Sequence, residues 1–204
     1  KMNTIFQVPK PVNEAILNYA PGSAERKELK AKLAELRGQV IEIPLIIGGK
    51  EIRTGRTADI IIPHENKKVI GRFHKAGPKE VQLAAEAAAK ARAVWGKMPW
   101  HARASTFLKA GDPLATTWRQ QLNAATMLGQ SKTPFQAEID SACELADFFR
   151  FNTYYAEQIY AQQPISPRGN WNYVDYRPLE GFVFAVTPFN FTSIAGNLPS
   201  APAI

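Results

Sequence analysis

An asparagine lies between two phenylalanines in the segment Thr187-Pro188-Phe189-Asn190-Phe191, directly after an apolar run. That run, residues 181–186, reads Gly-Phe-Val-Phe-Ala-Val and is typical of a short strand buried on both faces. In open α/β sheets, ligands bind beyond the carboxyl ends of the strands, which is where Asn190 would lie. Its amide offers two uncharged N–H donors, which suit an oxyanion in a water-poor cleft. A loop asparagine that merely tolerates an unusual turn fits the residues equally well.

The other residues that could carry chemistry give weaker signals. The single cysteine, Cys143, falls on the apolar face of a predicted helix, so we interpret it as a small packing residue rather than a nucleophile. One cysteine also excludes a disulfide framework within the chain. The three histidines are far apart in the sequence and lack ligand spacing, so no metal site is expected at His64, His74 and His101.

Helical periodicity and capping residues predict most of the elements that must position these groups. Ser23 is the expected N-cap of the first helix and Gly38 its stop, while Ser131 or Thr133 is expected to cap a later one. Pro113 disfavours an uninterrupted helix around it. The helices are expected over residues 24–37, 79–95, 100–110, 117–127 and 135–160.

Strands are predicted on either side of these helices. Residues 41–47, 60–62 and 69–73 are rich in β-branched residues and separated by turn signals, which indicates a β-meander rather than a βαβ unit. Residues 171–176 alternate like a strand, and residues 181–186 form the buried strand, followed by a helix beginning at about Ser193. A buried strand followed by a helix is the first half of a βαβ unit, so we expect that the natural chain continues or that other chains cover this edge.

Composition narrows the function classes. The net charge is +7, but Lys and Arg alternate with Glu, as in residues 25–30, which is typical of a solvated surface rather than a nucleic-acid interface. No apolar run is long enough for a membrane-spanning helix. The chain begins at Lys1 rather than Met, which is compatible with a targeting peptide that has been removed.

Several segments resemble one family. Pro188-Phe189-Asn190-Phe191 is similar to a segment of the aldehyde dehydrogenase superfamily, and its context, residues 179–191, resembles the pyrroline-5-carboxylate (glutamate γ-semialdehyde) dehydrogenases. The resemblance covers nearly the whole chain. Supporting segments are residues 13–36, Ile43-Pro44, 127–133, 136–140, 144–152 and 162–166.

The resemblance implies an enzyme that uses NAD to oxidise a small aldehyde, L-glutamate γ-semialdehyde, to L-glutamate in proline degradation. By position, Asn190 matches the asparagine that stabilises the oxyanion. Thr187, Pro188 and Phe189 match positions at the NAD site, and Phe191 and Glu144 match positions near the substrate. An exposed helical Glu remains an equal alternative for Glu144. The nucleophilic cysteine, the general-base glutamate and the glycine-rich NAD segment of the family lie beyond these residues.

The resemblance also implies a fold and its divisions. The expected class is α/β, the N-terminal part of the aldehyde dehydrogenase fold, incomplete at its C-terminus. Its parts are an arm and helix (1–38), the first part of the NAD-binding domain (39–162), an oligomerisation hairpin (163–180) and the start of a Rossmann-like core (181–204). A homo-oligomer through the hairpin is expected, in the mitochondrial matrix of a eukaryote or the cytoplasm of a bacterium.

A non-catalytic role is the alternative. If the natural chain had these 204 residues alone, it would be a dehydrogenase fragment serving as a structural or interaction subunit of a larger assembly. An intact mass near 22.6 kDa would support the fragment, and a mass more than twice as large would support the enzyme.

Overall fold

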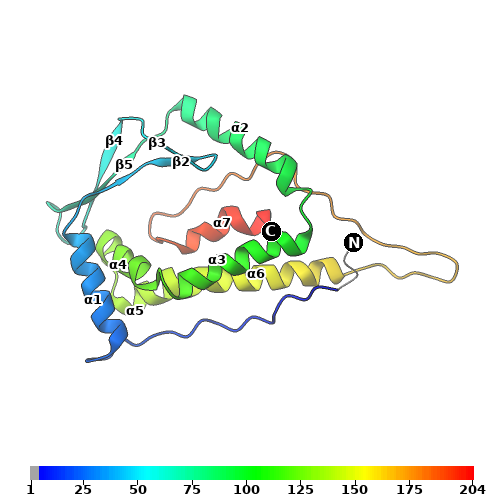
Figure 1. The fold of residues 1–204 in the computed structure, drawn as a ribbon, viewed down its shortest axis with the longest axis horizontal. Helices are drawn as coiled ribbons and strands as arrows, with labels where there is room; N and C mark the ends of the chain where they lie inside the picture. Colours follow the sequence, from blue (N-terminus) through cyan, green and yellow to red (C-terminus); the bar gives the residue numbers. More distant parts are fainter. Residues whose placement is uncertain (1–4) are drawn as a thin grey trace.

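The computed structural model describes residues 5–204, which form an elongated molecule with the strands near one end and a protruding loop at the other (Figure 1). Helices α2 (Pro78–Trp95), α3 (Trp100–Ala115) and α6 (Glu144–Ala161) run along its length. Helix α3 packs on α6, and α1 (Ala24–Arg37) packs on α4 (Arg119–Gln130). No helix among the residues from 5 onward has both the length and the hydropathy of a membrane span.

The strands form two small sheets rather than one meander. Strands β1 (Ile41–Ile43), β5 (Val69–His74) and β4 (Thr57–Ile61) form a sheet in that order, in which β1 is parallel and β4 antiparallel to β5. Strands β2 (Leu45–Ile47) and β3 (Lys50–Ile52) form a separate hairpin. The predicted meander is therefore wrong for β1. Pro44 has no N–H to donate to a ladder, and it divides the predicted strand between the two sheets.

The helix boundaries follow local capping chemistry at most ends. The hydroxyl of Ser23 accepts a hydrogen bond from the Arg26 N–H, and Gly38 ends α1, as predicted. Helix α3, however, continues through Pro113 to Ala115, so the expected interruption there is wrong. Because Pro113 lies in the last turn, it removes only a hydrogen bond near the helix end, and its own carbonyl accepts from the Trp118 N–H at 2.8 Å.

The long helix predicted over residues 135–160 contains an irregularity that the periodicity did not predict. It begins as α5 (Pro134–Ala137), where Thr133 and Gln136 form a capping box, and Ser131 precedes it in the left-handed region at φ 57°. A π-helical turn, Glu138–Cys143, then leads into α6. Such wide turns are frequent at functional sites.

The core lies where the strands meet the end of α4. Buried side chains from α1, α4 and the end of β4 pack against Tyr19 of the N-terminal arm, which runs beside α6 (Figure 1). The arm, residues 5–22, has no regular secondary structure. It is held instead by hydrogen bonds to α6 and the π-helical turn, such as Val8 N–H to Glu157 Oε2 at 2.7 Å.

Two predicted strands are absent from residues 163–186. The first, residues 171–176, belongs to an extended loop that protrudes from the molecule (Figure 1). Its limbs are joined by side chains rather than by a main-chain ladder, for example Gln163 Oε1, which accepts from the Val174 N–H at 2.8 Å. The second, residues 181–186, is extended and exposed rather than buried, with Phe184 81% and Val186 74% exposed. Both segments lack a neighbouring strand among the described residues, and pairing is what makes an extended segment a strand.

Candidate active site

The loop of residues 187–193 connects the exposed segment 181–186 to a short helical stretch, Ile194–Gly196 followed by α7 (Asn197–Ser200) and Ala201–Ala203. The helical stretch confirms the predicted helix start at Ser193. The buried Ser193 hydroxyl donates to the carbonyl of Ser141 in the π-helical turn. One end of the loop is thereby fixed to the interior of the helical layer.

Lys132, in the turn between α4 and α5, holds the middle of the loop. Its ammonium group donates to the main-chain carbonyl of Asn190 at 2.6 Å and lies 4.4 Å from the ring centroid of Phe191. It also forms an ion pair with Asp140 of the π-helical turn. The Lys132 and Asp140 side chains are 16% and 19% exposed, so solvent screens the pair less than it screens a surface pair.

Gln130, the last residue of α4, contacts the same loop with its amide. Its orientation is assigned from the hydrogen-bond network, which is satisfied when the oxygen faces the N–H groups. The oxygen then accepts from the main-chain N–H groups of Phe191 and Thr192 at 3.2 and 3.1 Å, and the nitrogen donates to the Asn190 carbonyl at 3.0 Å. Lys132 and Gln130 therefore both hold the main chain of the loop.

The side chains of residues 187–190 face outward. Thr187, Pro188, Phe189 and Asn190 are exposed, and Phe189 is 95% exposed. Among the described residues, neither the Thr187 hydroxyl nor the Asn190 amide has a hydrogen-bond partner, so both can still bind a ligand. Phe191 is partly buried under Lys132.

Glu144, the first residue of α6, lies near the same cation. Burial raises the pKa of its carboxyl group above the ordinary value, and the nearby Asp140 and Asp147 carboxylates raise it further, while Lys132 acts in the opposite direction. The structure thus brings Asn190 and Phe191 together at Lys132, with Glu144 close enough for the cation to affect its pKa. Their roles at the site remain predictions.

The thiol of Cys143 is unsuited to nucleophilic attack. It is buried, and burial raises its pKa to about 12, with the nearby Glu138 carboxylate acting in the same direction. The thiolate is the reactive form of cysteine, so this side chain acts in packing, as the sequence indicated.

A buried polar cluster beneath the site was not predicted. The guanidinium of Arg119 bonds the carboxylate of Glu138 in the π-helical turn, and Tyr19 Oη donates to the same carboxylate at 2.6 Å. Burial by itself would raise the pKa of Glu138, but the hydrogen bonds from Arg119 and Tyr19 outweigh it and lower the pKa. Asn123 Nδ2 completes the cluster with a bond of 2.7 Å to Glu138. No sequence signal pairs these residues, which lie up to 119 positions apart.

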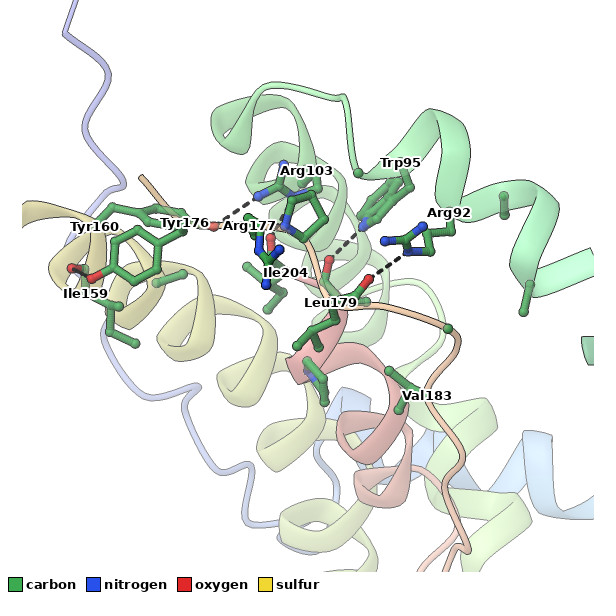
Figure 2. Close-up of a pocket in the computed structure, with 18 residues that line it drawn as sticks. Arg92, Trp95, Arg103, Ile159, Tyr160, Tyr176, Arg177, Leu179, Val183 and Ile204 are labelled. Atoms are coloured by element: carbon green, nitrogen blue, oxygen red, sulfur yellow. Dashed lines mark hydrogen bonds between the residues drawn. The ribbon is translucent and has the colours of Figure 1, made fainter. Parts of the chain in front are cut away.

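A cavity of about 710 Å³ lies elsewhere, between the C-terminal parts of α2 and α6 and the segment 176–183 (Figure 2). Two of its lining side chains donate to main-chain carbonyls: Trp95 Nε1 to that of Ala203 at 2.7 Å and Arg92 Nε to that of Leu179 at 2.8 Å. Arg103 bridges the Ile204 carbonyl and Tyr160 Oη. The bonds of Trp95 and Arg103 anchor the helical stretch that follows the loop, and the residues predicted to carry chemistry do not line this cavity.

Comparison with known proteins matches residues 51–204 to the family described as "Aldehyde dehydrogenase family". The chain belongs to the aldehyde dehydrogenase family. It is 51% identical over 201 residues to a delta-1-pyrroline-5-carboxylate dehydrogenase of Agaricus bisporus. The matched region covers 98% of this chain and 37% of that protein. The chain is 44% identical over 195 residues to the mitochondrial enzyme of that name from Homo sapiens, covering 96% and 35%.

Solved structures place the family fold along the whole chain. The delta-pyrroline-5-carboxylate dehydrogenase of Mycobacterium tuberculosis, bound with NAD, superposes with a TM-score of 0.96 at 51% identity, over 99% of this chain and 38% of that one. A Thermus 1-pyrroline-5-carboxylate dehydrogenase with bound NAD gives 0.86 at 27% identity, over 97% and 39%. This aldehyde dehydrogenase chain thus spans little more than a third of these relatives and matches an N-terminal portion of the fold, which confirms the predicted family and fold class.

Proposed function

We propose that this chain is the N-terminal part of an NAD-dependent dehydrogenase that oxidises L-glutamate γ-semialdehyde, the open form of pyrroline-5-carboxylate, to L-glutamate in proline degradation. The observation that carries the proposal is the 51% identity to a delta-1-pyrroline-5-carboxylate dehydrogenase along almost the entire chain. Relatives with that name also occur in Dictyostelium discoideum and Homo sapiens. These names favour the enzyme over a structural fragment.

The residues present fit NAD at the start of the loop. Thr187 offers a hydroxyl that is free of partners within residues 5–204, and Pro188 and Phe189 beside it are exposed and can be covered by a ligand. We assign these residues to the cofactor site. When bound, NAD accepts the hydride that leaves the aldehyde carbon, and water supplies the second oxygen of the carboxylate product.

We assign to Asn190 the role of stabilising the oxyanion. In this family's reaction a cysteine thiolate adds to the aldehyde carbon and leaves a negative charge on the oxygen; Cys143 is buried, so the nucleophile comes from outside these residues. The Asn190 amide donates to that oxygen without a charge of its own, while Lys132 and Gln130 keep its main chain in place. Phe191 and Glu144 are assigned to the surroundings of the substrate.

We further propose a homo-oligomer formed through the loop of residues 163–180. We also propose the division of the chain into the four parts given under the sequence analysis. The support is that this loop protrudes and exposes large apolar side chains, including Ile165 at 88% and Trp171 at 89%. Relatives from Dictyostelium and Homo sapiens are named mitochondrial, which supports the matrix if the source is a eukaryote, whereas a bacterial protein would be cytoplasmic.

The test uses the full-length protein with NAD and pyrroline-5-carboxylate. NADH formation that requires both compounds is the expected result, with L-glutamate as the product. A folded full-length protein that binds NAD but forms no NADH with this substrate would refute the assignment. Acetaldehyde lacks the carboxylate of the proposed substrate. A less specific aldehyde dehydrogenase would oxidise both compounds, so acetaldehyde as a second substrate distinguishes the two kinds of enzyme.

A further inference from the structure

The loop that carries Asn190 combines exposed side chains with a closely held main chain. Residues 187–190 are exposed, yet the Asn190 carbonyl accepts from Lys132 at 2.6 Å and from Gln130 at 3.0 Å. The Ser193 hydroxyl fixes the far end of the loop on the carbonyl of Ser141. A loop held this way can direct an outward side chain, because its main chain cannot turn freely.

Lys132 is the charged member of this support, and it is itself fixed. Its ammonium group has three N–H donors, and the ion pair with Asp140 and the bond to the Asn190 carbonyl use two of them. The cation also lies over the Phe191 ring, an arrangement favoured by the negative face of the ring. The lysine therefore joins the predicted oxyanion donor, a predicted substrate contact and the π-helical turn in one cluster.

The π-helical turn explains why the supporting groups reach the loop. A wide turn shifts the main-chain hydrogen-bond pattern and re-aims the side chains that follow it. Here the Ser141 carbonyl accepts from Ser193, and Asp140 faces Lys132, while Glu138 of the same turn bonds Arg119 on the other side. The turn thus supports the loop on one side and the N-terminal arm on the other.

We propose that Lys132 is a positioning residue for the oxidation: through the Asn190 carbonyl and the Phe191 ring it fixes the direction in which the Asn190 amide donates. Lys132 does not touch the substrate in this role. The inference rests on the proposed function, and it adds a residue whose contribution passes entirely through its neighbours in the loop.

The test compares variants of the full-length enzyme in steady-state assays. Lys132→Met keeps the apolar stem over Phe191 and removes the charge and its hydrogen bonds. We expect kcat to fall by roughly 10- to 100-fold, less than the roughly 10²–10³ lost when an oxyanion donor is removed, with KM for NAD nearly unchanged. Lys132→Arg keeps the charge and should recover part of the loss. Lys109→Met, on the exposed face of α3, is the matched control and should keep the kcat of the parent enzyme.

A double-mutant cycle separates positioning from a general structural role. If Lys132 acts through Asn190, Lys132→Met should lower kcat by less than about 3-fold in an Asn190→Ala background, because the group it positions is gone. Hydrogen exchange should quicken at residues 187–193 in Lys132→Met, while exchange in α1 stays as in the parent. This second readout does not depend on activity.

The outcomes are distinguishable. A parent enzyme without activity refutes the proposed function, whereas an active parent whose Lys132→Met variant keeps full kcat refutes the positioning role alone. Additive losses in the cycle contradict action through Asn190. A lowered melting temperature with faster exchange in α1 as well as the loop would show that Lys132 is merely structural, and would also overturn the inference.

Discussion

The two polar groups of Asn190 have different surroundings. Its main-chain carbonyl is held by Lys132, while its side-chain amide has no partner among the described residues. A donor that is free but directed can bind a developing charge without first breaking another bond, which is the condition for effective oxyanion stabilisation. The first prediction concerns this amide.

Replacement of Asn190 by alanine should lower kcat by roughly 10²–10³, because one donor to the oxyanion is lost. The melting temperature should stay close to that of the parent, since the side chain is exposed and makes no bonds within residues 5–204. Steady-state kinetics and a thermal scan of the full-length enzyme measure both. Asn66→Ala, at an exposed turn, is the control; a loss of stability without a loss of kcat would favour a structural role for Asn190.

Glu144→Gln should stabilise the full-length protein at neutral pH. The folded-state pKa of Glu144 is raised above 4.5 by burial and by Asp140 and Asp147, so the charged form opposes folding. That penalty is present above the folded-state pKa, shrinks as the pH falls through it, and disappears below 4.5, where folded and unfolded states are both protonated. The melting temperatures of parent and variant should therefore converge on acidification. Glu28→Gln on α1 is the exposed control, and an equal gain at every pH would contradict this cause.

At the scale of elements, the π-helical turn and the N-terminal arm depend on each other. Glu138 bonds Arg119, Tyr19 Oη and, at 2.8 Å, the main-chain N–H of Leu17. Arg119 also bonds Glu14, so the same two side chains hold the arm at Glu14, Leu17 and Tyr19. A buried charge that loses its partner costs much more than a surface charge does.

Glu138→Gln should therefore lower the free energy of unfolding by roughly 3 kcal/mol, the low end for a broken buried pair, because Arg119 keeps Glu14. The folded-state pKa of Glu138 is lowered from 4.5, so its carboxylate stabilises the protein above that pH, and this contribution is lost as the pH falls through the folded-state pKa. Denaturant unfolding between neutral and acidic pH measures the difference from the parent.

The matched control for this substitution is Glu65→Gln, which breaks the exposed pair with Arg37. It should change the free energy of unfolding far less than Glu138→Gln does, because exposed ion pairs contribute little. Hydrogen exchange locates the effect: Glu138→Gln should speed exchange at Leu17, whose N–H bonds the carboxylate. Equal effects of the two substitutions would contradict the special role of the buried pair.

The sequence predicted the elements whose signals are local. The ends of α1 were readable because Ser23 and Gly38 cap it through neighbours a few residues away. The parallel pairing of β1 with β5 could not be predicted from the sequence, because Ile41 pairs with Gly71 across 30 positions and no local pattern encodes that partner. The sequence did not predict the π-helical turn. A single widened turn leaves the helical pattern of apolar residues nearly intact before and after it.

The site was predictable in part for the same reason. Asn190 stood out through its position after an apolar run, and its neighbours through a resemblance. Lys132 did not, because its role depends on contacts with a loop 58 positions away. Residues 181–186 read as a buried strand from their composition, but burial requires partner strands, which the described residues do not supply.

At the scale of the whole molecule, the protruding loop of residues 163–180 is the surface on which assembly is predicted. Replacing both Trp171 and Tyr173, which are 89% and 73% exposed, with serine should convert the full-length oligomer to smaller species, because their apolar area would be covered by another subunit. Light scattering coupled to size-exclusion chromatography measures the mass. Trp118→Ser, an exposed residue outside the loop, is the control; an unchanged mass for the double variant would place the interface elsewhere.

The docking of the arm also bears on biosynthesis. The Val8 N–H finds its acceptor on Glu157, 149 residues later in the chain. At a translation rate of about 5–20 residues per second, the ribosome needs roughly 7–30 s to make that stretch. Throughout that interval the segment around Val8 lacks its native acceptor on α6. Val8 is thus made long before the residue that accepts its hydrogen bond, and this part of the arm completes its native contacts only after α6 has been made.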